Sequence, residues 1–128
     1  MKHFIVLGNP IPKERARVMT NKRAFTPSRT VEAERMIKFC ARSAGVKPIS
    51  GSVSIQIDFY RDSNRKCDLD NLCKTVLDSL NGGIAYRDDS QVVCIHATKN
   101  ICKENPRTEV WIFRGFLSDG SLDFPTET

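Results

Sequence analysis

The feature that most constrains the fold is a strand pattern joined by a short polar loop to a helix pattern. Apolar side chains alternate with polar ones between residues 53 and 60, at Val53, Ile55, Ile57 and Phe59. This period of two predicts a β-strand with one buried face. Farther along the chain, apolar side chains recur at helical spacing, at Leu69, Leu72, Cys73, Val76 and Leu80. They predict an amphipathic helix over residues 69–81, which Gly82 and Gly83 would end.

The remaining segments indicate one α/β domain over residues 1–128. Thr26-Pro27-Ser28 signals the start of an earlier helix, and Gly45 signals its end. Further strands are expected at three places, over residues 3–8, 91–99 and 107–116. We expect residues 15–25 to form a hairpin-like or mobile arm, and residues 117–128 a flexible tail. The order strand, helix, strand, helix, strand, strand predicts a mixed sheet of about four strands with two principal helices packed on it.

Composition narrows the class of partner. The chain has 128 residues, a net charge of +5 and an isoelectric point near 9.1, and such a basic balance favours a polyanion such as nucleic acid. The five cysteines include no C-x-x-C pair, so we expect free thiols rather than disulfides or zinc ligands. No apolar run approaches the roughly 18 residues of a membrane span, and residues 4–7 are too short for a signal peptide. We therefore expect a cytoplasmic protein with no membrane partner.

Two aspartates, Asp68 and Asp70, lie at the start of the second predicted helix. Aspartate is a favoured N-cap residue, and an acid in the first turn suits the helix dipole, so a structural role alone accounts for both. Lys74 follows Asp70 by four residues and therefore lies on the same helix face. A second acidic pair, Asp88 and Asp89, follows about twenty residues after the first. The sequence alone leaves open whether the chain returns to bring Asp89 near Asp68.

Basic residues surround these acids, namely Arg61, Arg65, Lys66 and Arg87. Mg²⁺ prefers oxygen ligands and typically takes one or two carboxylates together with substrate phosphates and water. Two such ions about 3.5–4 Å apart can activate a water molecule and stabilise the leaving oxygen of a phosphodiester. Carboxylates repel a phosphate unless cations offset their charge. Acids inside a basic rim therefore fit phosphodiester cleavage better than simple DNA binding.

Three runs carry a resemblance to a known family. They are Asp68-Leu69-Asp70-Asn71-Leu72-x-Lys74, then Leu77-Asp78-x-Leu80-Asn81-Gly82, and then Tyr86-x-Asp88-Asp89-x-Gln91-Val92. Together they resemble the signature of RusA-type Holliday junction resolvases. The N-terminal run Gly8-Asn9-Pro10-Ile11-Pro12-Lys13 resembles phage-type members of that family. This sequence departs from better-known members before the acid pair, where its basic run is interrupted by Ser63 and Asn64 and ends in Cys67.

The resemblance implies a homodimeric, Mg²⁺-dependent endonuclease that nicks four-way DNA junctions symmetrically. It implies that Asp68, Asp70 and Asp89 are essential acids that bind the metal, and that Lys74 is an essential lysine. Lys74 would contact the scissile phosphate or stabilise the charge that develops on it. Asp88 is adjacent to this set and would at most assist it.

A wider set of basic side chains is expected to hold the DNA backbone. They are Lys13, Arg15, Arg17, Lys22, Arg23, Arg65 and Lys66. Such contacts supply affinity and salt dependence rather than base readout. Two other functions stay open: a non-catalytic basic DNA-binding module, and a metal-dependent hydrolase of another phosphate ester. His96 lies outside the acid motif, and Trp111 and Phe113 are expected to pack on a sheet rather than stack on bases.

Overall fold

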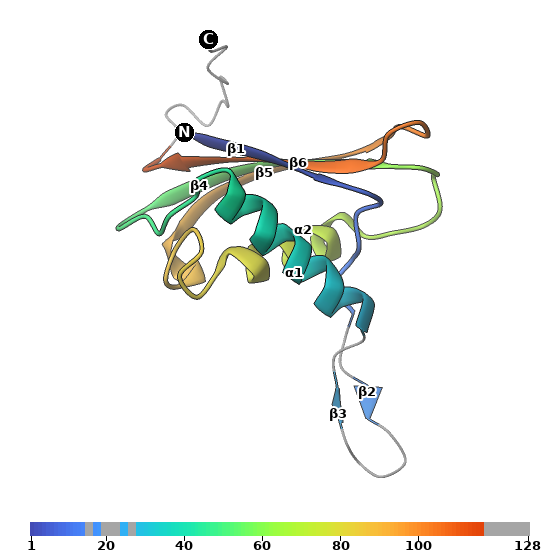
Figure 1. Ribbon diagram of the computed structural model, residues 1–128, viewed down its shortest axis with the longest axis horizontal. Helices are drawn as coiled ribbons and strands as arrows, with labels where there is room; N and C mark the ends of the chain where they lie inside the picture. The colour runs from blue at the N-terminus through green and yellow to red at the C-terminus, as the bar shows by residue number, and fades with distance from the viewer. Residues whose placement is uncertain (15–16, 19–23, 26–27, 117–128) are drawn as a thin grey trace.

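Four strands form the central sheet, in the order β1-β6-β4-β5 (Figure 1). A computed structural model describes residues 1–14, 17–18, 24–25 and 28–116. The strands are β1 (Lys2–Leu7), β4 (Val53–Arg61), β5 (Val92–Ile101) and β6 (Arg107–Arg114). Strand β6 pairs antiparallel with both β1 and β4, whereas β4 and β5 are parallel. The predicted mixed sheet of four strands is confirmed.

Both helices, α1 (Ser28–Ser43) and α2 (Leu69–Leu80), cover the same face of the sheet (Figure 1). The chain is therefore a single α/β domain, as the sequence predicts. A short 3₁₀ helix, η1 (Asp89–Gln91), precedes β5. Strands β2 (Arg17–Val18) and β3 (Ala24–Phe25) pair antiparallel in a separate ladder, which gives the predicted hairpin-like arm.

The prediction of a flexible tail concerns residues that the structure does not describe. Among the helices described, none has the length and apolar character needed to cross a membrane.

The hydrophobic core lies between the sheet and the two helices. From α2 it takes Leu72, Val76 and Leu80, each at most 1% exposed. Strand β4 departs from the prediction of one buried face, because Ser54 and Gln56 on its other face are also buried, at 0% and 5% exposure. The reason is that β4 lies inside the sheet, where the neighbouring strands β5 and β6 shield even small polar side chains. The Ser54 hydroxyl is satisfied because it donates to the Gly115 carbonyl at 2.7 Å.

Helix α1 buries only a narrow stripe of its apolar residues. Ile37 and Ala41 are buried, but Met36 is 50% exposed. The neighbouring Phe39 is 65% exposed. Because α1 contacts β1, at one edge of the sheet, and α2 beside it, only the side chains between these two neighbours leave solvent.

Tyr86 holds the return of the chain from α2 to β5. Its hydroxyl donates to the Leu77 carbonyl of α2 at 2.6 Å, and the ring is fully buried, which raises the pKa of this phenol. The turn also uses a bond from the Ala85 N–H to the Leu80 carbonyl at 2.9 Å. Gly82 and Gly83 adopt positive φ angles of 77° and 107°, which explains why the turn needs glycine. This anchored turn fixes where Asp89 lies.

Replacing Tyr86 with Phe is expected to lower the free energy of unfolding by about 1 kcal/mol, since it deletes one buried hydrogen bond and leaves the ring in place. Urea unfolding followed by circular dichroism measures this change. Tyr60→Phe is the matched control, because the Tyr60 hydroxyl makes no hydrogen bond to any residue in the described part of the chain. An equal effect of the two replacements would contradict the anchoring role of Tyr86.

Candidate active site

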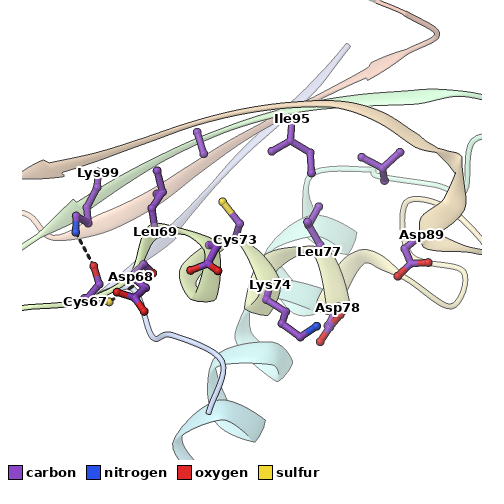
Figure 2. A pocket seen from close by; sticks show the side chains of 13 residues that line it. Cys67, Asp68, Leu69, Cys73, Lys74, Leu77, Asp78, Asp89, Ile95 and Lys99 are labelled. Atoms are coloured by element: carbon purple, nitrogen blue, oxygen red, sulfur yellow. Dashed lines mark hydrogen bonds between the residues drawn. The ribbon is translucent and has the colours of Figure 1, made fainter. Parts of the chain in front are cut away.

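A groove of about 1020 Å³ runs between α2 and β5 (Figure 2). Its charged lining consists of Asp68, Asp70, Asp78, Asp89, Lys74 and Lys99. Its apolar lining consists of Leu69, Leu77, Val92, Ile95 and Ala97, together with Cys67 and Cys73. We call this cavity the acidic groove. All four residues that the sequence marks as catalytic line it, namely Asp68, Asp70, Lys74 and Asp89.

The acids lie at both ends of the acidic groove and do not form one cluster. Helix α2 connects the end of β4 to the start of the parallel strand β5, so the two ends of the helix lie near opposite ends of these strands. Asp68 precedes α2, whereas Asp89 precedes β5, and Figure 2 shows the two on opposite sides of the groove. Along β5, Val92 and Lys99 are separated by roughly 23 Å at about 3.3 Å per residue.

The Lys99 ammonium marks the Asp68 end of the groove, because it donates to the Cys67 carbonyl at 2.5 Å. The chain therefore brings Asp89 to the same groove as Asp68, but to its opposite end. No three His, Cys, Asp or Glu side chains in the described part of the chain are spaced to hold a metal ion together.

The structural interpretation of the two aspartates is confirmed in position only, with Asp68 at the N-cap and Asp70 in the first turn of α2. Asp68 occupies the N-cap position of α2, with φ −80° and ψ 130°, but its side chain makes no capping hydrogen bond. The Asp70 carboxylate likewise has no hydrogen-bond or ion-pair partner among the residues described. Asp70 still suits the helix dipole from the first turn, but neither carboxylate has a hydrogen-bond or ion-pair partner among the described residues, and both residues line the acidic groove.

Asp88 and Asp89 have different roles although they are neighbours. The Asp88 carboxylate accepts hydrogen bonds from the Ser90 hydroxyl and, at 3.0 Å, from the Ser90 N–H, and these bonds lower the pKa of Asp88. The Gln91 side chain accepts in return from the Asp88 N–H at 3.2 Å, which completes a capping box around η1. Asp88 is therefore a structural residue, whereas the exposed Asp89 lines the acidic groove.

Lys13 is engaged within the chain. Its ammonium lies 2.6 Å from the Glu34 carboxylate and 3.1 Å from the Asp78 carboxylate. Burial lowers the pKa of Lys13, but hydrogen bonds to these two acids outweigh it, so the pKa rises overall. Its backbone N–H also donates to the Asn71 carbonyl at 2.9 Å. Lys13 thus ties the N-terminal segment to both helices, and two acids compensate its charge.

The other predicted DNA-binding residues are only partly described. Arg65 and Lys66 are exposed and line a smaller pocket beside the acidic groove. Arg15, Lys22 and Arg23 lie outside the described residues, as does the side chain of Arg17. For these residues DNA binding stays a prediction.

Sequence reasoning missed Asp78 and Lys99 as groove residues. Asp78 had a readable signal, since it follows Lys74 by four residues on the same helix face. Lys99 had none, because only the parallel pairing of β4 with β5 carries it to the groove. Trp111 stacks on His3 with ring centroids 4.5 Å apart, so this ring packs on the sheet as expected.

Replacing Asp88 with Ala is expected to loosen η1 because the capping box is lost, whereas Asp89→Ala should leave the turn intact. Hydrogen–deuterium exchange measures the difference: the amides of Ser90 and Gln91 should exchange faster in the first variant alone. Similar exchange in the two variants would contradict this division of roles.

Comparison with known proteins places the chain in a family. Residues 8–113 match the model of a protein family described as endodeoxyribonuclease RusA. No curated protein matched the sequence. The family match spans well over half of the chain, and it includes every acid of the groove and the strands and helices that position them. The chain therefore belongs to the RusA family of endodeoxyribonucleases.

Proposed function

We propose that this chain resolves four-way DNA junctions as a Mg²⁺-dependent homodimer in which each active site combines two copies. Asp68 and Asp70 would come from one copy and Asp89 from the other. The observation that carries the proposal is the placement of the acids at opposite ends of one groove. The five cysteines are all free, which suits a reducing compartment, and we include a cytoplasmic location in the proposal.

The donor set suits magnesium. It consists of carboxylate oxygens, and Mg²⁺ typically needs only one or two protein carboxylates because water and substrate phosphate complete its shell. Asp68 and Asp70 would hold the ion, with Asp89 of a second copy completing the site. When bound, Mg²⁺ offsets the charge of the phosphate and favours ionisation of an attacking water molecule.

Lys74 supplies a cation on the same face of α2 as Asp70. It is exposed, lines the groove and has no ion-pair partner among the residues described. An unpaired ammonium in this place attracts a backbone phosphate and stabilises the negative charge that grows as the phosphodiester is cleaved. Its role is electrostatic positioning and does not require it to transfer a proton.

The surface around the groove supports a second copy as the missing partner. Strand β5 is an edge strand, since it pairs with β4 alone, and an open edge of this kind invites pairing with another chain. Ile95 in the middle of the groove is 47% exposed and its neighbour Val93 is 39% exposed. A two-fold axis at the middle of the groove exchanges its ends, so Asp89 of each copy approaches Asp68 and Asp70 of the other.

The two alternative functions have weaker support. A non-catalytic DNA-binding module gives no reason for acids that line a groove without a hydrogen-bond or ion-pair partner among the described residues. A hydrolase of another phosphate ester does not agree with the family match, which is to an endodeoxyribonuclease. Two related sites in one dimer match the two equivalent strands of a four-way junction.

Mixing two inactive variants tests the shared site. Asp70→Asn and Asp89→Asn are each expected to abolish cutting. In a mixed dimer, one site contains both replacements and the other contains neither. Refolding the two variants together should therefore restore single-strand nicking of a junction at about a quarter of the sites. Gel analysis of labelled junction strands measures it.

The control is each variant refolded alone at the same total concentration. If both acids served one site within a single chain, every site in a mixed dimer would carry one replacement and the mixture would stay inactive. The oligomeric state of each sample, measured by light scattering, shows whether mixed dimers could form.

Wild-type protein is expected to place paired nicks in a synthetic immobile four-way junction with Mg²⁺ and none with EDTA. It should leave a matched linear duplex intact. Asp70→Asn should still bind the junction, because it removes a metal ligand but no backbone contact. Equal cutting of both substrates would support a nuclease activity but contradict specificity for junctions.

A further inference from the structure

A second pocket, of about 320 Å³, lies beside the acidic groove and is lined by four basic side chains. Arg29 comes from the start of α1, Arg61 from the end of β4, and Arg65 and Lys66 from the loop between β4 and α2. Residues 9–12 also line it. We call this cavity the basic pocket. We infer that it binds a backbone phosphate of the same DNA strand that crosses the acidic groove, an inference that rests on the proposed function.

The four cations have no acidic partner within the described part of the chain. The one acid that lines the basic pocket, Asp62, is engaged by Asn9: its carboxylate accepts from the Asn9 amide at 2.8 Å, and its N–H donates to the Asn9 carbonyl oxygen at 3.0 Å. Lys13 nearby differs, since it has two carboxylate partners. The single Asp62 carboxylate offsets at most one of the four positive charges, and the remaining like charges repel each other. A bound anion removes that repulsion.

Arg29 lies in a position that does not favour its charge. It is the second residue of α1, whose first turn contains no acid, and a cation near a helix N-terminus opposes the helix dipole. The side chain is exposed and forms no hydrogen bond or ion pair with a described residue. Folding therefore gives no reason for an arginine here, whereas a phosphate in the basic pocket does.

The walls of the basic pocket are held in place before any ligand arrives. The Arg61 guanidinium donates to the Arg65 carbonyl, which fixes the loop onto the end of β4. The paired hydrogen bonds between Asn9 and Asp62 fix the opposite wall to the same loop. Arginine presents a rigid fork of N–H donors that matches phosphate oxygens. A pocket organised in this way loses little conformational entropy when a phosphodiester binds.

Cys67 shows how the two cavities are connected, because it lines both of them. The next residue is Asp68, at the end of the acidic groove. A strand with its scissile phosphate beside Asp68 and Asp70 would therefore continue into the basic pocket, where a phosphate close to the cut binds. Contacts of this kind position the strand and read no base.

Neutral methylphosphonate linkages test the inference. The Asp70→Asn protein, kept in EDTA so that nothing is cut, is titrated with junctions that carry one such linkage at each position along the strands near the branch point. One of these positions should weaken binding. That loss should disappear when Arg29→Gln is added, because the neutral glutamine gains nothing from the charge of the phosphate and so loses nothing when the linkage is neutral. The dependence of log affinity on log salt should also fall by about 0.7–0.9 in slope.

Arg42→Gln is the matched control, since Arg42 is an exposed, unpaired arginine in the last turn of the same helix; it should keep the wild-type linkage profile and salt slope. Lys66→Gln should repeat the effect of Arg29→Gln at the same or an adjacent linkage. If Arg29→Gln behaves like Arg42→Gln, the inference that the basic pocket binds a phosphate is wrong. Junction cutting by the wild type can still support the proposed function in that case. If the linkage effect is present but the wild type never cuts, the proposed function fails and phosphate binding in the pocket stands.

Discussion

The parallel pairing of β4 with β5 is the constraint on which the active-site geometry depends. Two parallel neighbours cannot be joined by a tight turn, so the chain must cross back over the length of the sheet. Helix α2 makes that crossing, and its twelve residues span about 18 Å at 1.5 Å per residue. A residue just before α2 and a residue just before β5 therefore lie at opposite ends of the β4 and β5 strands. Asp68 and Asp89 hold these two positions.

The stability of α2 does not depend on its polar face. Leu72, Val76 and Leu80 are essentially fully buried, and burial of such side chains contributes roughly 1.5–3 kcal/mol each. The carboxylates of Asp68 and Asp70 need no hydrogen-bond or ion-pair partner, and have none among the described residues, because the apolar face already holds the helix on the sheet. Asp88 illustrates the opposite case, since its carboxylate is occupied by the capping box of η1. The acids near the groove therefore differ in whether the fold occupies their carboxylates.

The fold could be predicted from local patterns, but the active-site geometry could be predicted only in part. The alternation at residues 53–60 and the helical spacing at residues 69–80 are properties of neighbouring residues, so the corresponding elements follow directly from the sequence. The structural role of Asp88 was also readable, because Asp88 and Gln91 have the spacing of a capping box. The burial of Ser54 and Gln56 was not, since it depends on which strands flank β4.

Long-range placement explains the remaining differences. Lys13 looked like a free surface cation because its acidic partners, Glu34 and Asp78, are distant in sequence and meet only when α1 packs on α2. Lys99 looked unremarkable because only strand pairing carries it to the groove. The net charge of the chain therefore gives little information by itself about where a phosphate binds. Cations such as Lys13 and Arg107, which have carboxylate partners, hold the fold together. Cations such as Lys74 and Arg29, which lack one in the described chain, line the acidic groove and the basic pocket, two cavities that meet at Cys67.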